Sequence, residues 1–164
     1  MTGSNMEIAE KGGGAEVTPD ETGHWVSARV GATYFTEIEA RTHRLLADEP
    51  VVLGGSDAGP TPYELLLAAL GSCMAMTMRM YATRKQWPLE EAYVRLRTAP
   101  ARDADRGVRV AGAKSVSRIE RRIEFQGALT EEQRLRLVQI ADRCPVKRHI
   151  EAGLDVVGPA GGTA

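Results

Sequence analysis

The longest stretch of strongly apolar residues in this chain, Leu65 to Met78, predicts a long buried helix. Apolar side chains fall on every side of that helix, which is typical of a helix packed on several sides in the middle of a fold. The segment before it carries a start signal: Thr61 is a plausible N-cap, Pro62 suits the first helical position, and Glu64 completes a Thr-x-x-Glu capping box. We expect the helix to end at Trp87-Pro88, because proline restricts the residue before it to extended conformations.

Short alternating segments on both sides of this helix predict antiparallel strands. Before the helix, residues 25–30 and 33–40 are separated by a Gly-Ala pair and look like a β-hairpin, with residues 44–47 as a candidate third strand. After the helix, the alternation of apolar and charged residues predicts strands over 93–98 and 116–126.

The second of these later strands has two distinct faces. Ile119, Ile123 and Phe125 share one face, and the other face is charged. Arg121 is the one charged residue on the apolar face. The pattern predicts a half-exposed strand, and the mostly polar segment 102–112 before it is expected to form the tip of a hairpin.

A second helix, again with a capping box, is predicted to follow. Thr130 and Gln133 form the box, and residues 135–141 give the helix one apolar side. Cys144-Pro145 breaks this helix and starts a short new turn, after which residues 154–157 are a candidate edge strand. The order of strands, helix, strands, helix and strand predicts an α+β fold in which a long central apolar helix packs against antiparallel sheet.

Charge and composition narrow the functional classes. The 164 residues contain 21 Lys and Arg against 22 Asp and Glu, a net charge of −1, which gives no electrostatic argument for nucleic acid or membrane as partner. The apolar stretch is about 14 residues long, short of the roughly 20 that span a bilayer. No signal-peptide pattern opens the chain. A cytoplasmic location, where a permanent disulfide is uncommon, is therefore the expectation.

The chain is most simply one folded domain with two unstructured ends. Residues 1–23 are rich in glycine, glutamate and small polar residues, so we expect a disordered leader. Residues 158–164 are expected to be a flexible tail. This leaves residues 24–157 as a domain long enough to bury a core.

Two cysteines are the first candidates for chemistry, because a thiol reacts as the thiolate and its surroundings decide whether the thiolate forms. Cys144 is at a predicted helix start, where unpaired N–H groups and two nearby basic residues, Lys147 and Arg148, lower a thiol pKa. Cys73 lies in the apolar helix, where desolvation disfavours the thiolate. Each is also explained as an inert buried thiol. Separated by about 70 residues, they form a pair only if the fold brings them together.

Other chemical candidates have structural explanations of equal or greater weight. Glu64 is able to orient a substrate oxygen or an arginine, but its capping box already accounts for it. Four methionines suit an adaptable cavity, although on a buried helix they usually fill the core: Met74, Met76, Met78 and Met80. The three histidines and two cysteines show no close ligand spacing, so the sequence predicts neither a metal site nor a cofactor.

Three segments resemble the OsmC/Ohr family, whose members include osmotically induced protein C and organic hydroperoxide resistance protein. They are the run from Gly59 to Cys73, the run from Met76 to Tyr81, and Arg143-Cys144-Pro145-Val146. Residues 47–50 and Gly54-Gly55 look like one OsmC-like subgroup. The likeness covers roughly residues 25–157.

The resemblance implies an intertwined homodimer of α+β subunits and the thiol-dependent reduction of organic hydroperoxides in a stress response. Cys73 matches the peroxidatic cysteine of the family and Cys144 the resolving one. The sulfenic acid formed on Cys73 would condense with Cys144 to a redox-active disulfide, which a small dithiol or other thiol reductant reopens. The family also implies an arginine from the N-terminal strands beside the thiolate, for which Arg44 or Arg29 is the candidate, and an acidic residue at the helix start, here Glu64.

Two alternatives to a peroxiredoxin-like cysteine peroxidase stay open. Peroxidase members place a glutamate directly after the proline that opens the long helix, where this chain has Tyr63, followed by Glu64. One alternative is therefore a dimeric binding or redox-sensing protein with the same fold and little peroxidase turnover. The other is an inert α+β domain with two incidental core thiols, which the paired cysteine motifs disfavour.

Overall fold

The structure is a computed structural model that describes residues 25–100 and 116–156. The chain divides into two compact units between Gly59 and Pro60. The described residues form an α+β fold with three α-helices and two antiparallel sheets, as the order of elements predicts. The predicted leader 1–23, hairpin tip 102–112 and tail 158–164 lie outside the described residues.

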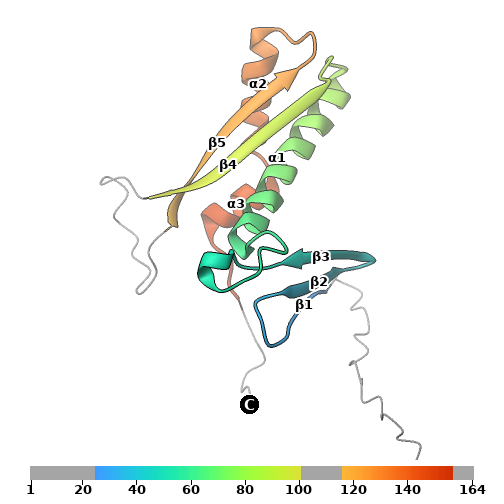
Figure 1. Ribbon diagram of the computed structural model, residues 1–164. Helices are drawn as coiled ribbons and strands as arrows, with labels where there is room; N and C mark the ends of the chain where they lie inside the picture. The colour runs from blue at the N-terminus through green and yellow to red at the C-terminus, as the bar shows by residue number, and fades with distance from the viewer. Residues whose placement is uncertain (1–24, 101–115, 157–164) are drawn as a thin grey trace, which may run out of the picture. The chain divides into compact units, whose positions relative to one another are not determined.

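The first unit contains a three-stranded antiparallel sheet in the order β1-β2-β3 (Figure 1). Its strands are β1 (Val26–Val30), β2 (Thr36–Ala40) and β3 (His43–Ala47), and a short 3₁₀ helix follows at Val51–Leu53. Val26 pairs with Ala40 in the first strand pair. The three predicted strands are confirmed, each within a few residues of its predicted bounds.

The loop after β3 is organised by the buried carboxylate of Asp48. This carboxylate accepts hydrogen bonds from the Ser56 hydroxyl at 2.6 Å and the Ser56 N–H at 3.0 Å. The N–H groups of Glu49 and Ala58 donate to it at 2.8 and 3.2 Å. The Ser56 hydroxyl contributes most, ahead of the N–H groups, to holding the pKa of Asp48 at about 2, because each bond favours the charged form.

The second unit is built around the predicted long helix, α1 (Pro62–Lys85). Its capping box is complete: the Thr61 hydroxyl accepts the Glu64 N–H at 3.3 Å, and the Glu64 carboxylate accepts the Thr61 N–H at 2.8 Å. Gln86 ends the helix with a left-handed backbone, φ 54°. The helix therefore begins where the sequence predicts, and its last residue, Lys85, is two residues before the predicted Trp87-Pro88.

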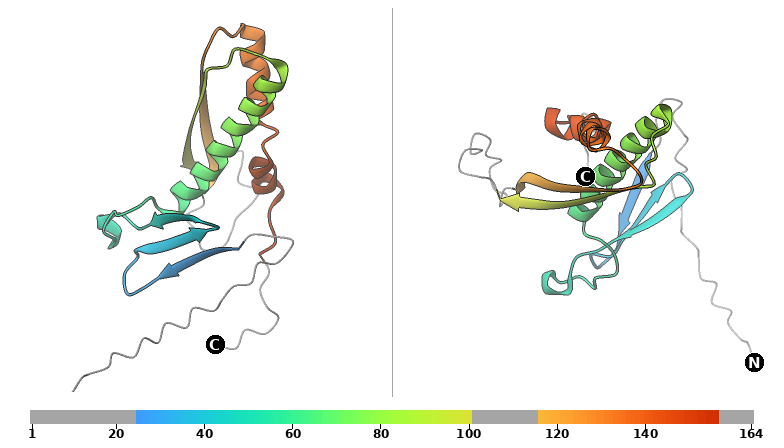
Figure 2. Two further views of the ribbon diagram at one scale, coloured as in Figure 1. Left: turned by 90° about the vertical axis from the view of Figure 1, so that its right-hand side faces the viewer. Right: turned by 90° about the horizontal axis from the view of Figure 1, so that it is seen from above.

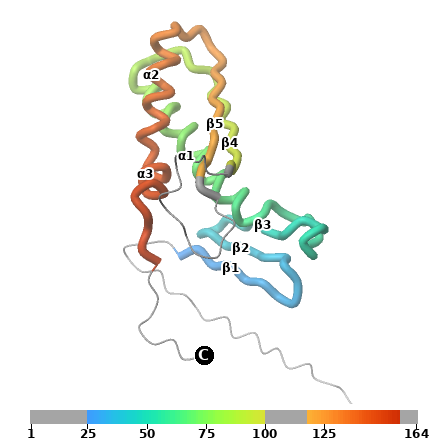
Figure 3. The backbone as a smooth tube through the Cα atoms, turned by 90° about the vertical axis from the view of Figure 1, so that its left-hand side faces the viewer, coloured from blue at the N-terminus to red at the C-terminus, as the bar shows by residue number. Residues whose placement is uncertain are grey.

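Two strands and two further helices complete this unit. They are β4 (Glu91–Pro100), β5 (Val116–Gln126), α2 (Glu131–Ala141) and α3 (Pro145–Ala152). β4 and β5 form an antiparallel ribbon that α1 follows (Figure 2). Figure 3 shows α1 between this ribbon and α2, and α1 contacts β4, α2 and α3. The edge strand predicted at residues 154–157 is wrong in its described part: residues 154–156 are exposed and pair with neither sheet.

The core of the second unit lies where α1 meets the ribbon and α2. Its buried residues are Leu70, Met74, Met78, Ala82, Leu89, Leu129, Leu137, Ile140, Ala141 and Cys144. The apolar face of β5 packs against this cluster through Ile119, Ile123 and Phe125, as the alternating pattern predicts. The core thus contains one of the two cysteines, with Cys73 packed against it.

α1 is less buried than its all-round apolar pattern predicts. Met74 and Met78 fill the core, whereas Met76 and Met80 are 65% and 73% exposed. By length and composition α1 is apolar enough to cross a membrane, and 22% of its most apolar window is buried within the chain. The prediction of burial on every side is therefore wrong for a single chain, because α2, α3 and the ribbon leave one side of α1 uncovered.

Gly127 joins β5 to α2 at a point that has no room for a side chain. Its φ of 115° lies in the region that favours glycine. A Cβ atom there would lie 2.0 Å from the Pro88 carbonyl oxygen. Beside it, the Glu90 N–H donates to the Gln126 carbonyl at 2.9 Å. The segment after α1 is thus in backbone contact with the segment before α2.

Candidate active site

The fold brings the two cysteines together from segments about 70 residues apart. Cys73 lies in the middle of α1, and Cys144 lies between α2 and α3, both of which contact α1. The Cys144 and Cys73 side chains lie close enough for Cys73 to raise the pKa of the Cys144 thiol, and both cysteines are free thiols. Proximity of the two sulfurs is the geometric condition for a couple that alternates between two thiols and a disulfide.

The burial of the two cysteines is the reverse of the sequence expectation. Cys144 is 0% exposed, whereas Cys73 is half-buried. Burial raises the pKa of the Cys144 thiol, and the neighbouring Cys73 side chain adds to the rise. The N–H groups of Val146 and Lys147 act in the opposite direction but do not form a side-chain cap hydrogen bond. The prediction that the helix start lowers this pKa is therefore wrong in its net direction, because burial outweighs the N–H groups.

Cys73 is held on a well-anchored part of α1. The residues around it, Leu70 and Met74, are buried in the core. One turn further on, the Thr77 hydroxyl donates to the Cys73 carbonyl oxygen at 2.7 Å. The backbone of Cys73, and with it the position of the side chain, is therefore well anchored.

A cavity of about 670 Å³ borders the segments that carry both cysteines. Its apolar lining comes from α1, the ribbon and α3: Tyr63, Leu66, Leu70, Met74, Leu96, Ile119 and Ile150. Its charged lining comes from β5 and the segment from Asp142 through α3: Arg118, Arg121, Asp142, Lys147 and Glu151. A mostly apolar wall with a few charged groups suits a small organic molecule.

Four of the charged groups that line this cavity form one network. The Arg121 guanidinium donates to the two Asp142 carboxylate oxygens at 2.7 and 2.9 Å. Lys147 Nζ lies 3.4 Å from Asp142 Oδ1 and 2.7 Å from Glu151 Oε1. The bonds from Arg121 lower the pKa of Asp142, and the bond to Glu151 raises the pKa of Lys147. Sequence reasoning noticed Arg121 as a charge on an apolar face but had no signal for its partner.

The other two predicted site residues have local partners. Arg44 lies on β3, in the first unit, with its Nε 3.4 Å from Glu39 Oε1. Glu64 accepts hydrogen bonds from the N–H and the hydroxyl of Thr61 at 2.8 and 3.0 Å, and these bonds lower its pKa. The capping role of Glu64 is confirmed. Tyr63, rather than Glu64, lines the cavity.

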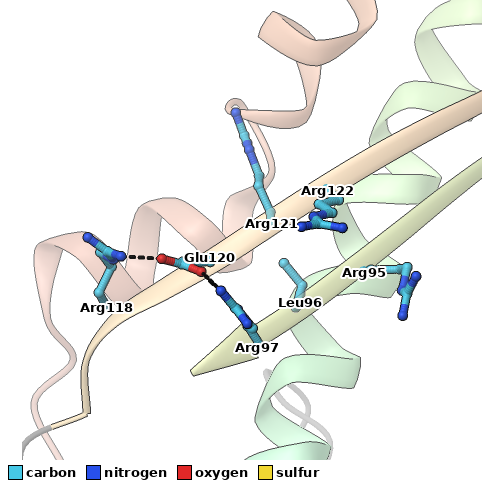
Figure 4. A pocket seen from close by; sticks show the side chains of 7 residues that line it. All are labelled: Arg95, Leu96, Arg97, Arg118, Glu120, Arg121 and Arg122. Atoms are coloured by element: carbon cyan, nitrogen blue, oxygen red, sulfur yellow. Dashed lines mark hydrogen bonds and ion pairs between the residues drawn. The ribbon is translucent and has the colours of Figure 1, made fainter. Parts of the chain in front are cut away.

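A second cavity, of about 560 Å³, lies on the ribbon among arginines (Figure 4). Its lining residues are Arg95, Leu96, Arg97, Arg118, Glu120, Arg121 and Arg122. Glu120 pairs with Arg97 at 2.6 Å and also with Arg118. Neither cysteine lines either cavity, but this one is lined by β4 and β5 alone, without the segments that carry the cysteines, so we assign it no part in the cysteine site. Within the described ranges, no three histidine, cysteine or acidic side chains converge as metal ligands do.

The comparisons with known proteins concern the family and the fold of the chain. A profile of the family described as OsmC-like protein matches residues 54–157. No curated protein sequence matches the chain. The structure is similar to that of an OsmC-like protein from Mycoplasma pneumoniae, with 14% identity, a TM-score of 0.65, and coverage of 80% of this chain and 89% of that one.

Two similar structures carry functional names. One is an organic hydroperoxide resistance protein OsmC from Legionella pneumophila, with 17% identity, a TM-score of 0.54, and coverage of 80% and 91%. The other is a putative organic hydroperoxide resistance protein from Vibrio cholerae with captopril bound in one of its active sites, with 20% identity, a TM-score of 0.52, and coverage of 80% and 87%. At these identities the likeness shows the fold. Together with the family match, it places this chain in the OsmC-like family.

Proposed function

We propose that this protein is a thiol-dependent peroxidase that reduces organic hydroperoxides through Cys73 and Cys144. The observation that carries the proposal is the contact between the two thiols. The family match and the names of two similar structures support hydroperoxides as the substrate class and a role in the stress response.

Cys73 is assigned the attacking role because it is the less buried of the two thiols. Its thiolate attacks the terminal oxygen of the hydroperoxide, the O–O bond breaks, and the alkoxide takes up a proton and leaves as an alcohol. Cys144 remains a thiol in this step, because burial raises its pKa. A hydrogen bond donated by this thiol to the Cys73 thiolate would stabilise the negative charge there.

Cys144 is assigned the resolving role. Its sulfur attacks the Cys73 sulfenic acid, a disulfide forms, and the hydroxyl leaves as water with the Cys144 proton. A small dithiol then supplies two electrons and two protons by exchange, which restores both thiols and leaves the reductant as a disulfide.

The proposal assigns Arg44 as the cation beside the Cys73 thiolate and Glu64 as the acid that orients it. Arg44 has a longer contact to its acidic neighbour, 3.4 Å, than the 2.6 Å between Arg29 and Glu37, so its guanidinium is the less committed of the two candidates. We expect Arg44→Gln and Glu64→Gln each to slow peroxide consumption by about tenfold or more. Arg29→Gln is the matched control and should keep the wild-type rate.

We also propose that the protein is a homodimer in which the uncovered side of α1 faces a second copy. The support is the exposure of Met76 and Met80 on a helix that contains a long apolar stretch. Light scattering should give a dimer mass for the wild-type protein and a monomer mass for the double variant Met76→Glu, Met80→Glu. Arg95→Glu, on the ribbon, should leave the dimer intact. A monomeric wild-type protein would exclude the interface.

A cytoplasmic location is part of the same proposal. Both cysteines are free, and a reducing compartment is where a cysteine pair is returned to thiols after each cycle. Fractionation of cells that express the protein should recover it in the soluble cytoplasmic fraction. Recovery with the membranes would contradict this location.

The test of the peroxidase proposal is peroxide consumption in the presence of dithiothreitol. Cumene hydroperoxide should be consumed repeatedly and faster than hydrogen peroxide, because the cavity that borders the segments carrying both cysteines is lined largely by apolar side chains. Cys73→Ser should abolish consumption, and Ser72→Ala, at an exposed neighbour on α1, should not. Mass spectrometry after one equivalent of peroxide should show a Cys73–Cys144 crosslink within one subunit. Undiminished consumption by Cys73→Ser would refute the assignment.

A dimeric binding or redox-sensing protein is the second candidate. The observation that favours it is the engagement of the Glu64 carboxylate with Thr61, while Tyr63 lines the cavity. A sensor would form the disulfide with one equivalent of peroxide but would turn over slowly with dithiothreitol. Comparison of the single-turnover rate with the steady-state rate separates the two functions.

A further inference from the structure

Arg121 interrupts the hydrophobic face of β5. Its neighbours on that face, Ile119 and Ile123, pack against the core, and Leu96 lies directly opposite on β4. A guanidinium in such a place loses hydration, and only a well-placed partner offsets the loss. In Figure 4 the Arg121 side chain extends from β5 toward the helical segment drawn above the ribbon.

The partner of Arg121 is the residue two positions before Cys144. The two parallel hydrogen bonds to Asp142, at 2.7 and 2.9 Å, fix the relative orientation of both side chains as well as their distance. Lys147, in the first turn of α3, approaches the same carboxylate at 3.4 Å. Asp142 therefore connects β5 to both sides of the turn that contains Cys144.

That turn is short and internally bonded. The N–H of Arg143 donates to the Ile140 carbonyl at 2.9 Å, and the N–H of Cys144 donates to the Ala141 carbonyl at 3.2 Å. A displacement of Asp142 is therefore passed on to the Cys144 sulfur. Disulfide geometry tolerates little displacement, because the S–S bond and its torsion angle have narrow ranges.

Stability alone explains this ion pair poorly. The side chains of Arg121 and Asp142 are 27% and 43% exposed, and ion pairs of such exposure contribute little net stability. A methionine at position 121 would supply apolar contact with Leu96 without a charge to desolvate. What a methionine would not supply is the fixed direction of the two parallel bonds.

We propose that Arg121 and Asp142 are positioning residues: their ion pair holds the α2–α3 turn against β5 and thereby sets the Cys144 sulfur against the Cys73 sulfur. This inference deepens the proposed function, since it assigns the pair to the disulfide step. It adds to the reaction two residues that touch neither sulfur nor peroxide.

The test measures disulfide formation without peroxide. The protein is equilibrated with reduced and oxidised glutathione at a series of ratios and quenched with acid, and the Cys73–Cys144 disulfide is quantified by mass spectrometry. Arg121→Met and Asp142→Asn should each shift the equilibrium toward the thiols by about 10-fold to 100-fold, because a small misplacement of reacting atoms has effects of this size. Arg121→Lys should shift the equilibrium less than Arg121→Met does, because lysine keeps the positive charge. It should still cause some shift, because lysine does not form the two parallel hydrogen bonds of the guanidinium.

Arg122→Met is the matched control, since position 122 is the next residue on β5 and points to the opposite face. Thermal unfolding of each reduced variant reports whether it folds. If Arg121→Met does not fold, Asp142→Asn decides the question, because it keeps the side-chain volume.

Equilibrium constants of both variants within about twofold of wild type would overturn the proposal. So would a wild-type protein that forms no Cys73–Cys144 disulfide at any glutathione ratio. A wild-type protein that forms the disulfide but does not consume cumene hydroperoxide would defeat the proposed peroxidase function alone, and the positioning role would still be decided by the equilibrium constants.

Discussion

Two helices of the second unit begin with the same kind of pair, a hydroxyl or thiol residue followed by proline, yet the two starts are built differently. At Thr61-Pro62 the cap hydroxyl accepts the Glu64 N–H, and the Glu64 carboxylate returns a bond to the Thr61 N–H. At Cys144-Pro145 no side-chain cap hydrogen bond forms, and the thiol instead lies beside the Cys73 side chain and is affected by it. The first cap is satisfied locally, and the second is directed at a distant residue.

The difference shows how one local motif serves either stability or chemistry. A good N-cap contributes about 1 kcal/mol to the helix that it begins. Sulfur is a weak hydrogen-bond acceptor, so α3 gives up most of that contribution. In exchange, the Cys144 sulfur is held at a fixed point of the core where it meets Cys73. Four experiments test this contrast, from the largest expected effect to the smallest.

Cys144→Ser should give α3 a side-chain N-cap like the one that Thr61 provides for α1. Serine is a strong N-cap but is unable to form a disulfide, so we expect steady-state peroxide turnover with dithiothreitol to fall by about 100-fold or more. The unfolding midpoint of the reduced protein should stay within a few degrees of wild type. Peroxide assays and circular dichroism on the same samples measure both. Wild-type turnover in this variant would show that Cys144 is not the resolving thiol.

Thr61→Ala should have the opposite profile. Loss of the cap hydroxyl is expected to reduce the free energy of unfolding by about 1 kcal/mol, measured by urea denaturation. The disulfide equilibrium in glutathione should not change, and Thr61→Ser should match wild type in both measurements. A shifted disulfide equilibrium in Thr61→Ala would mean that the Thr61 hydroxyl also serves the cysteine site.

The two helix starts also show what the sequence reveals about this fold. The Thr-Pro-x-Glu signal is local, so it predicted the first residue of α1, and alternation predicted β5 with the correct bounds. The burial of Cys144 is not determined by its local sequence. Its burial depends on α1 and α2 packing over it, and those contacts reversed the expected direction of its pKa shift.

The same reasoning applies to the pairs that form the site. The contact between Cys73 and Cys144 was expected only through family resemblance, because no local spacing links residues so far apart. Arg121 was visible as a conflict in the strand pattern, but its partner Asp142 is on another element and became apparent only from the fold. Exposure of one side of α1 was likewise missed, since an all-round apolar helix gives no sign of which side its own chain covers.

Alkylation of Cys144 should report its burial directly. Burial raises the pKa of this thiol, so the thiolate fraction in the reduced folded protein stays small until the pH exceeds the ordinary value of 9.0. We expect iodoacetamide to label Cys144 slowly at pH 8 in the folded protein and at the rate of an ordinary thiol in urea. Peptide mass spectrometry resolves the two cysteines. Rapid labelling of Cys144 in the folded protein would contradict its burial.

The last prediction concerns Asp48, whose carboxylate organises a loop rather than a helix start. Its substitution is expected to have the smallest effect of the four at neutral pH. Its folded pKa of about 2 lies below the ordinary 3.8, so its contribution to stability is complete above about pH 4 and is lost as the pH falls toward 2. Asp48→Asn should therefore be less stable than wild type at pH 6, and the difference should shrink toward pH 2. Thermal unfolding at a series of pH values measures it. A constant difference would show that the charge on Asp48 is not what matters.

The backbone contact at Gly127 has a consequence for how this chain tolerates variation. The segment after α1, which carries Cys73, meets the segment before α2, which leads to Cys144. Their backbones are so close at Gly127 that even a methyl group is excluded. Any larger residue would wedge these two connections apart, and the strain would reach both sulfurs through the helices attached to them. Position 127 is accordingly where a saturation library should be least permissive: a site remote from the sulfurs whose alteration disables them together.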